Sequence, residues 1–130
     1  MTSLLRAALL ASGPLNLAGA ALFAPPSVPL RAAFGVPEAP AFYQWTLSLW
    51  VLAFGVAYAL AGWRGRTDAS LLALGAFGKV VFVALMTMMA WRGEVPVTTA
   101  LASLSDVVLA IVFVHAWWRL VAAGNGASTL

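Results

Sequence analysis

The stretch ASLLALGAFGKVVFVALMTMMAW, residues 69–91, carries a single charged side chain, Lys79, within an otherwise apolar run. This run is long enough to cross the hydrocarbon core of a bilayer, which takes about 20 helical residues. Three similar runs flank it, at residues 4–23, 42–63 and 97–118. Barrel strands are shorter and alternate polar with apolar residues, so these runs predict helices. We therefore expect an all-α membrane protein: an antiparallel four-helix transmembrane bundle, with residues 1–130 as a single domain.

The composition of the whole chain agrees with burial in lipid. Of its 130 residues, 63% are hydrophobic and 8% are charged, against about 25% charged in an average soluble domain. The net charge of +3 results from seven Lys and Arg residues against four Asp and Glu residues. The basic residues are scattered between apolar runs, whereas a nucleic-acid site needs a clustered basic face. The expected partner is therefore the lipid bilayer, not nucleic acid. Cysteine is absent, which excludes disulfides and thiol chemistry.

The two ends of the chain need separate interpretation. Arg6 and the small residues 18–20 also fit a cleavable signal peptide. Gly13, Pro14 and Asn16 interrupt that apolar run, and three spans still follow it, which favours a retained helix. At the other end, the Gly-, Ala- and Ser-rich residues 123–130 are expected to form a mobile tail.

The distribution of basic residues predicts the orientation. An even number of spans places both termini and the middle loop on one side, and that side carries Arg6, Arg64, Arg66 and Arg119. The other side carries Arg31 and Arg92, which are accompanied by Glu38 and Glu94. The positive-inside rule then places both termini in the cytoplasm.

Three polar residues are expected near the middle of the membrane. Lys79 and Asp106 lie roughly 15 Å and 14 Å into their spans at 1.5 Å per residue, and Asn16 reaches a similar depth. Because a polar side chain facing lipid is costly, we expect these groups to face the bundle interior. Ser103 is added to the candidate site because it shares a helix face with Asp106.

These residues allow three interpretations. Lys79 and Asp106 can form a buried structural ion pair, with Asn16 hydrogen-bonded to one partner. They can instead form a binding or proton-relay site, as titratable groups at mid-membrane often do. In the third case they do not meet, because Lys79 lies roughly 4.5 Å deeper from their shared loop than Asp106, and the two side chains lean in opposite directions.

Small residues predict where helices pack closely. Gly55, Ala59 and Gly62 give the second span a smooth face for contact with another helix. Gly75 lies one turn before Lys79 and is expected to make room for the lysine stem.

No residue pattern indicates catalysis or a metal. The chain has no nucleophile with an adjacent base, no paired carboxylates and no glycine-rich phosphate loop, so we lean against an enzyme. His115 is the single histidine and is expected at the membrane interface; haem or zinc needs further ligands. Tyr58 and Gln44 are interpreted as packed or interfacial residues, and no cofactor is assigned.

Residues 16–20 (NLAGA), 34–37 (FGVP) and 75–79 (GAFGK), together with Asp106, resemble small bacterial four-helix membrane proteins without an assigned activity. In size and layout these are similar to DoxX-like proteins. The resemblance implies a bacterial inner-membrane location and supports four spans, but it supplies no reaction.

Two functions follow as hypotheses. The first is a non-enzymatic accessory subunit, or a binder of an apolar small molecule such as a lipid or quinone. The alternative is a small transporter or channel that uses the Lys79–Asp106 pair. A homo-oligomer or a larger membrane complex is compatible with either hypothesis.

Overall fold

A computed structural model describes residues 1–127 of the chain, all of its regular structure being helical. The elements are α1 (Ser3–Phe23), α2 (Val28–Ala33), α3 (Ala41–Arg64), α4 (Ala69–Trp91), α5 (Val97–Ala102) and α6 (Ser105–Ala127). Four helical segments are long and apolar enough to cross a membrane: α1, α3, α4, and α5 taken together with α6. The predicted all-α membrane fold with four spans is confirmed.

Local sequence signals explain where the spans begin and end. The Thr2 side chain accepts a hydrogen bond from the Leu5 amide and caps α1, and Asp68 caps α4 in the same way through the Leu71 amide. The α3 helix ends at Gly65, whose φ of 67° is readily adopted by glycine. The first three spans therefore match the predicted ranges to within one residue at each end.

The fourth span departs from the predicted continuous helix. It is broken at residues 103–104, which separate α5 from α6. The α6 helix also runs beyond residue 118 to Ala127. Residues 123–127 of the expected tail are therefore helical, whereas residues 128–130 lie outside the described part of the chain.

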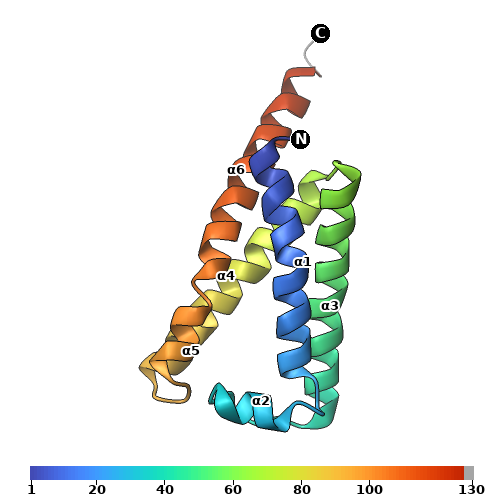
Figure 1. Cartoon of the computed structure of the whole chain (residues 1–130). Coiled ribbons are helices and arrows are strands. Elements are labelled where there is room, and N and C mark those ends of the chain that lie inside the picture. The colour runs from blue at the N-terminus through green and yellow to red at the C-terminus, as the bar shows by residue number, and fades with distance from the viewer. Residues whose placement is uncertain (128–130) are drawn as a thin grey trace.

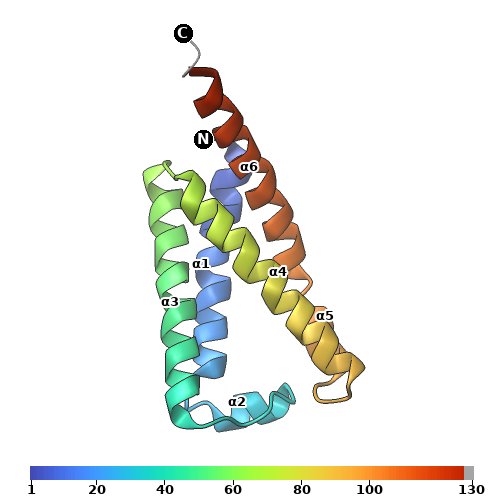
Figure 2. The same cartoon turned by 180° about the vertical axis from the view of Figure 1, so that it is seen from behind.

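The helices are arranged as two pairs (Figures 1 and 2). The α1 helix packs along α3, and α4 packs along α5 and α6. The pairs come together near the N-terminus and spread apart toward α2, which lies across the opposite end (Figure 1). The N-terminus, the α3–α4 loop and the C-terminal end of α6 share one end of the molecule, as an even number of spans requires.

The contact between α1 and α3 uses the small residues predicted for α3. A Cβ atom added to Gly55 would lie 2.8 Å from the Cβ of Asn16, and one added to Gly62 would lie 2.9 Å from the Leu10 side chain. Such distances leave no room for a larger residue. The predicted close-packing face of the second span is thus confirmed, and its partner is α1.

A compact apolar core joins the two pairs where they converge. It is built from Leu5, Ala8, Leu9, Tyr58, Ala61, Leu72, Ala76, Leu109 and Phe113. The outside of the bundle carries many exposed large apolar side chains, among them Trp63, Phe77 and Trp91. An apolar exterior around an apolar core is stable in lipid and not in water, so the fold is that of a membrane protein.

The segment between α1 and α3 is held by one buried arginine. Arg31 of α2 is 1% exposed, and its guanidinium donates hydrogen bonds to the Ala24 and Pro25 carbonyls at the end of α1. It also pairs with Glu38 over 3.2 Å, and Gln44 of α3 donates to the same carboxylate. The Arg31 bond, followed by that of Gln44, lowers the pKa of Glu38 below its ordinary value of 4.5. Arg31 therefore joins α1, α2 and the start of α3.

The other end of α2 is fastened to α5. The Thr99 hydroxyl donates a hydrogen bond to the Phe34 carbonyl over 2.5 Å. Gly35 follows with a φ of 61°, and a Cβ there would lie 2.5 Å from the Pro96 ring. The α2 helix thus links the two helix pairs at the end where they are farthest apart.

Candidate ligand-binding cavity

A cavity of about 430 Å³ lies between the two helix pairs. Its walls are mostly apolar and come from α1, α3, α4, α5 and α6 and from the segment after α2. The lining residues used below are Asn16, Phe23, Phe34, Val36, Trp50, Tyr58, Gly78, Lys79, Phe82, Met86, Ser103 and Asp106. Pockets for small molecules occupy about 300–1,000 Å³ and combine apolar walls with a few polar groups. This cavity has both properties.

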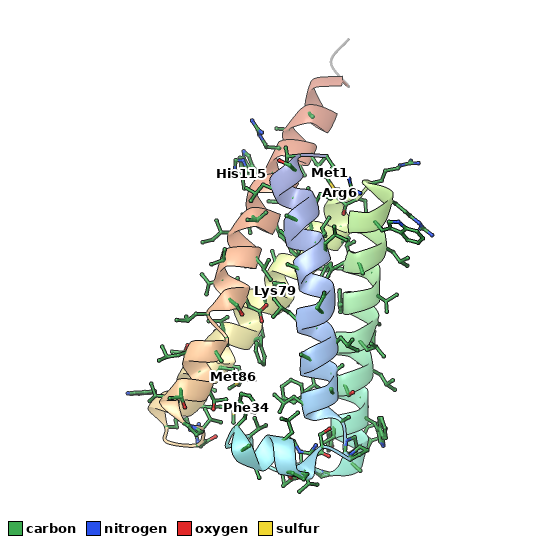
Figure 3. The ribbon with its side chains drawn as sticks, viewed as in Figure 1. Met1, Arg6, Phe34, Lys79, Met86 and His115 are labelled. Carbon is green, nitrogen blue, oxygen red and sulfur yellow. The ribbon has the colours of Figure 1, made fainter. Side chains whose placement is uncertain are left out.

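Lys79 and Asp106 meet at the wall of this cavity. The Nζ atom of Lys79 donates a hydrogen bond to Oδ1 of Asp106 over 2.5 Å. Their side chains are 7% and 20% exposed, respectively. Lys79 lies about midway along the bundle (Figure 3), so the pair sits well inside the span. The interpretation in which the two groups do not meet is wrong, because the long lysine stem covers the expected offset in depth.

The break in the fourth span places Asp106 in the first turn of α6. Around the break the backbone makes short-range bonds, from the Asp106 amide to the Ser103 carbonyl and from the Val107 amide to the Leu104 carbonyl, each 3.0 Å long. The amides at a helix N-terminus carry partial positive charge, which stabilises a carboxylate there. Asp106 therefore lies at the positive end of the α6 dipole and also contacts the Lys79 ammonium.

Asn16 lines the same cavity but does not bond the ion pair. Its side-chain amide donates to the Val51 carbonyl of α3 over 3.1 Å. The part of the structural-pair interpretation in which Asn16 hydrogen-bonds Lys79 or Asp106 is therefore wrong. Because α1 approaches α3 closely at Gly55, the Asn16 amide lies next to an α3 carbonyl and bonds it instead of a group on α4.

Ser103 forms the C-terminal end of α5 and also faces the cavity. Its hydroxyl donates to the Ala100 carbonyl over 2.6 Å, which leaves the hydroxyl oxygen free to accept. All four candidate residues from the sequence thus line one cavity, although only Lys79 and Asp106 bond each other through their side chains.

Tyr58 of α3, which the sequence suggested was a packed or interfacial residue, also lines the cavity. The residue is 2% exposed, and its hydroxyl makes no hydrogen bond within residues 1–123. The Lys79 Nζ lies 5.9 Å from the centre of its ring, within reach of a cation–π interaction. No spacing in the sequence relates Tyr58 to Lys79, because the two residues belong to different helix pairs.

Gly75 creates the position of the Tyr58 hydroxyl. A Cβ added to Gly75 would lie 2.5 Å from that oxygen and 3.1 Å from the Phe113 ring. Gly75 was expected to make room for the lysine stem. The contacts that require this glycine are instead those with Tyr58 and Phe113.

His115 lies apart from the cavity, toward the end that holds Met1 and Arg6 (Figure 3). It borders a shallow apolar groove between α4 and α6, together with Trp118. Within residues 1–127, no three His, Cys, Asp or Glu side chains are grouped closely enough to hold a metal ion.

When the chain was compared with protein families, with curated proteins and with solved structures, no match was found.

Proposed function

We propose that this membrane protein binds an apolar small molecule, such as a lipid or quinone, in the cavity between its two helix pairs. The observation that carries the proposal is the cavity itself: about 430 Å³, walled by apolar side chains, with a buried ion pair at its edge. A purely structural ion pair needs no open space beside it. The space between the pairs, by contrast, has the size and lining of a ligand pocket.

Two features support entry and retention of a lipophilic molecule. Phe23 of α1 and Phe82 of α4 meet edge to face, with ring centres 6.2 Å apart, and both line the cavity. Aromatic walls of this kind favour contact with rings and alkyl chains. Phe34 and Val36, which follow α2, extend the apolar lining toward the end where the pairs are spread apart (Figure 3).

The experiment is photo-crosslinking of the purified protein in nanodiscs with lipophilic diazirine probes, with the labelled residues identified by mass spectrometry. Probe bound in the cavity should label Phe23, Phe82 or Met86, and excess unlabelled ligand should compete with this labelling. Gly78→Phe should abolish it, because Gly78 lines the cavity and a Cβ added there meets no atom within 4 Å, which leaves space for a ring at the cavity wall. Val108→Phe is the matched control, since Val108 is 63% exposed and does not line the cavity. Labelling without competition, unchanged in Gly78→Phe, contradicts the proposal.

A transport function is the second candidate, favoured by the break between α5 and α6. Discontinuous spans often form substrate sites near the middle of the membrane in transporters, and this break directly precedes Asp106. If the protein is a transporter, proteoliposomes that contain it should release an enclosed solute or protons, and substitution of Lys79 or Asp106 should reduce this flux. Binding without any flux favours the first proposal.

We also propose a bacterial inner-membrane location with both termini in the cytoplasm. The end formed by the termini and the α3–α4 loop carries Arg6, Arg64, Arg66 and Arg119. At the opposite end each arginine is paired, Arg31 with Glu38 and Arg92 with Glu94. The larger number of basic residues on one side supports this orientation. A DoxX-like relationship and a role as an accessory subunit of a complex remain hypotheses based on size and layout.

A further inference from the structure

The charges at the cavity restrict the kind of ligand head that fits there. Lys79 and Asp106 neutralise each other through a bond of 2.5 Å inside the span. An anionic head would gain attraction from Lys79 and suffer repulsion from Asp106 at close range, where low dielectric strengthens both. It would also lose its hydration in an apolar cavity without a full compensating charge. An uncharged head avoids this cost.

The polar groups that remain free are suited to an oxygen atom on such a head. The lysine ammonium has three donors, and Asp106 uses one of them. The Tyr58 hydroxyl has no hydrogen-bond partner among the side chains and backbone described for residues 1–123, although the residue is 2% exposed and lines the cavity. The hydroxyl oxygen keeps some accessible surface, and in an apolar cavity a hydroxyl without a partner carries a cost. A ligand oxygen that accepts from Tyr58 would remove that cost.

The position of Tyr58 defines which part of the cavity holds the head. Tyr58 belongs to the core where the helix pairs converge, whereas Phe34 and Met86 lie toward α2 (Figure 3). Tyr58 and the ion pair therefore mark the polar part of the cavity, and the part toward α2 is mainly apolar, since the Thr99 hydroxyl there is already bonded to the Phe34 carbonyl.

We infer that the cavity selects a lipophile with an uncharged, oxygen-bearing head, a hydroxyl or carbonyl, which hydrogen-bonds to Tyr58 beside the Lys79–Asp106 pair. The alkyl chain of this ligand extends past Phe23, Phe82 and Met86 toward α2. This inference rests on the proposed function, because it names the ligand class for the same cavity. It differs from that proposal in excluding fatty acids and anionic lipids as preferred ligands.

The test compares three unlabelled competitors of matched chain length in the crosslinking assay: a fatty alcohol, the corresponding carboxylate at a pH where it is ionised, and the hydrocarbon. The alcohol should displace the probe at the lowest concentration. Tyr58→Phe removes one oxygen and should weaken competition by the alcohol about two- to tenfold, the range for one hydrogen bond. The same substitution should leave competition by the hydrocarbon unchanged. Tyr43→Phe is the matched control, since Tyr43 is 64% exposed and lies outside the cavity lining.

The outcomes separate the two proposals. If the carboxylate competes as well as the alcohol, or if Tyr58→Phe leaves the alcohol unaffected, the head-group inference is overturned while binding in the cavity stands. If no competitor displaces the probe and Gly78→Phe changes nothing, the proposed function itself fails. A melting temperature of Tyr58→Phe close to that of the parent shows that the substitution acts on binding and not on folding.

Discussion

Lys79 and Asp106 are 27 positions apart in the chain and come from α4 and α6, yet their side chains are joined by a 2.5 Å hydrogen bond within the membrane-spanning region. The pair lies at the wall of an apolar cavity, and Tyr58 lines the same cavity. The Tyr58 hydroxyl has no hydrogen-bond partner among the described residues 1–123. This grouping is the basis for both the ligand proposal and the first prediction below.

Breaking the ion pair from either side should destabilise the protein strongly. Lys79→Met leaves Asp106 as an uncompensated charge, and Asp106→Leu does the same to Lys79, at a cost of about 3–5 kcal/mol each. The double variant should lose much less, because no orphan charge remains. A double-mutant cycle on thermal stability in detergent measures the coupling. Strictly additive losses would show that the pair contributes no interaction energy.

Replacing Gly55 by leucine should lower stability by overfilling the α1–α3 contact. Even the first added carbon would lie 2.8 Å from the Asn16 side chain, and overpacking costs about 1–3 kcal/mol. Gly78→Leu is the matched control, because a Cβ added at Gly78 meets no atom within 4 Å and leucine favours helix over glycine. We expect Gly55→Leu to melt below the parent and Gly78→Leu to melt at or above it. Equal melting temperatures for all three proteins would place Gly55 toward lipid.

Acid should weaken the fastening of α2. The bonds from Arg31 and Gln44 lower the pKa of Glu38 below its ordinary 4.5. A lowered folded-state pKa stabilises the fold above the ordinary value, and this contribution disappears as the pH falls through the folded-state pKa. The melting temperature should therefore decline below pH 4.5. In Glu38→Gln that part of the decline should be missing, and an identical pH profile for both proteins would argue against the effect.

The orientation can be tested with reporter fusions. Fusions near Arg64 and Ala123 should read cytoplasmic, and a fusion near Glu38 should read periplasmic, because most of the basic residues lie on the side of the first two sites. A cytoplasmic reading at Glu38 would reverse the proposed topology.

The four spans could be predicted from the length of the apolar runs and the few charges within them. A run of that kind is compatible with a membrane-spanning helix and not with a barrel strand. The small-residue face of α3 could also be predicted from the sequence, because Gly55, Ala59 and Gly62 follow helical spacing within one segment. The sequence likewise placed Lys79 and Asp106 at similar depths, since depth depends on position along a single helix.

The tertiary structure alone decided how the helices pair, and hence what the polar residues contact. Asn16 bonds Val51 and not the ion pair, because α1 packs against α3 at Gly55. Gly75 makes room for Tyr58 and Phe113, and Arg31 becomes buried through carbonyls at the end of α1. These contacts join residues from different helices, whose relative rotation and separation are set by side-chain packing across the whole bundle. No spacing within one helix contains that information, so the cavity and its tyrosine emerged only from the fold.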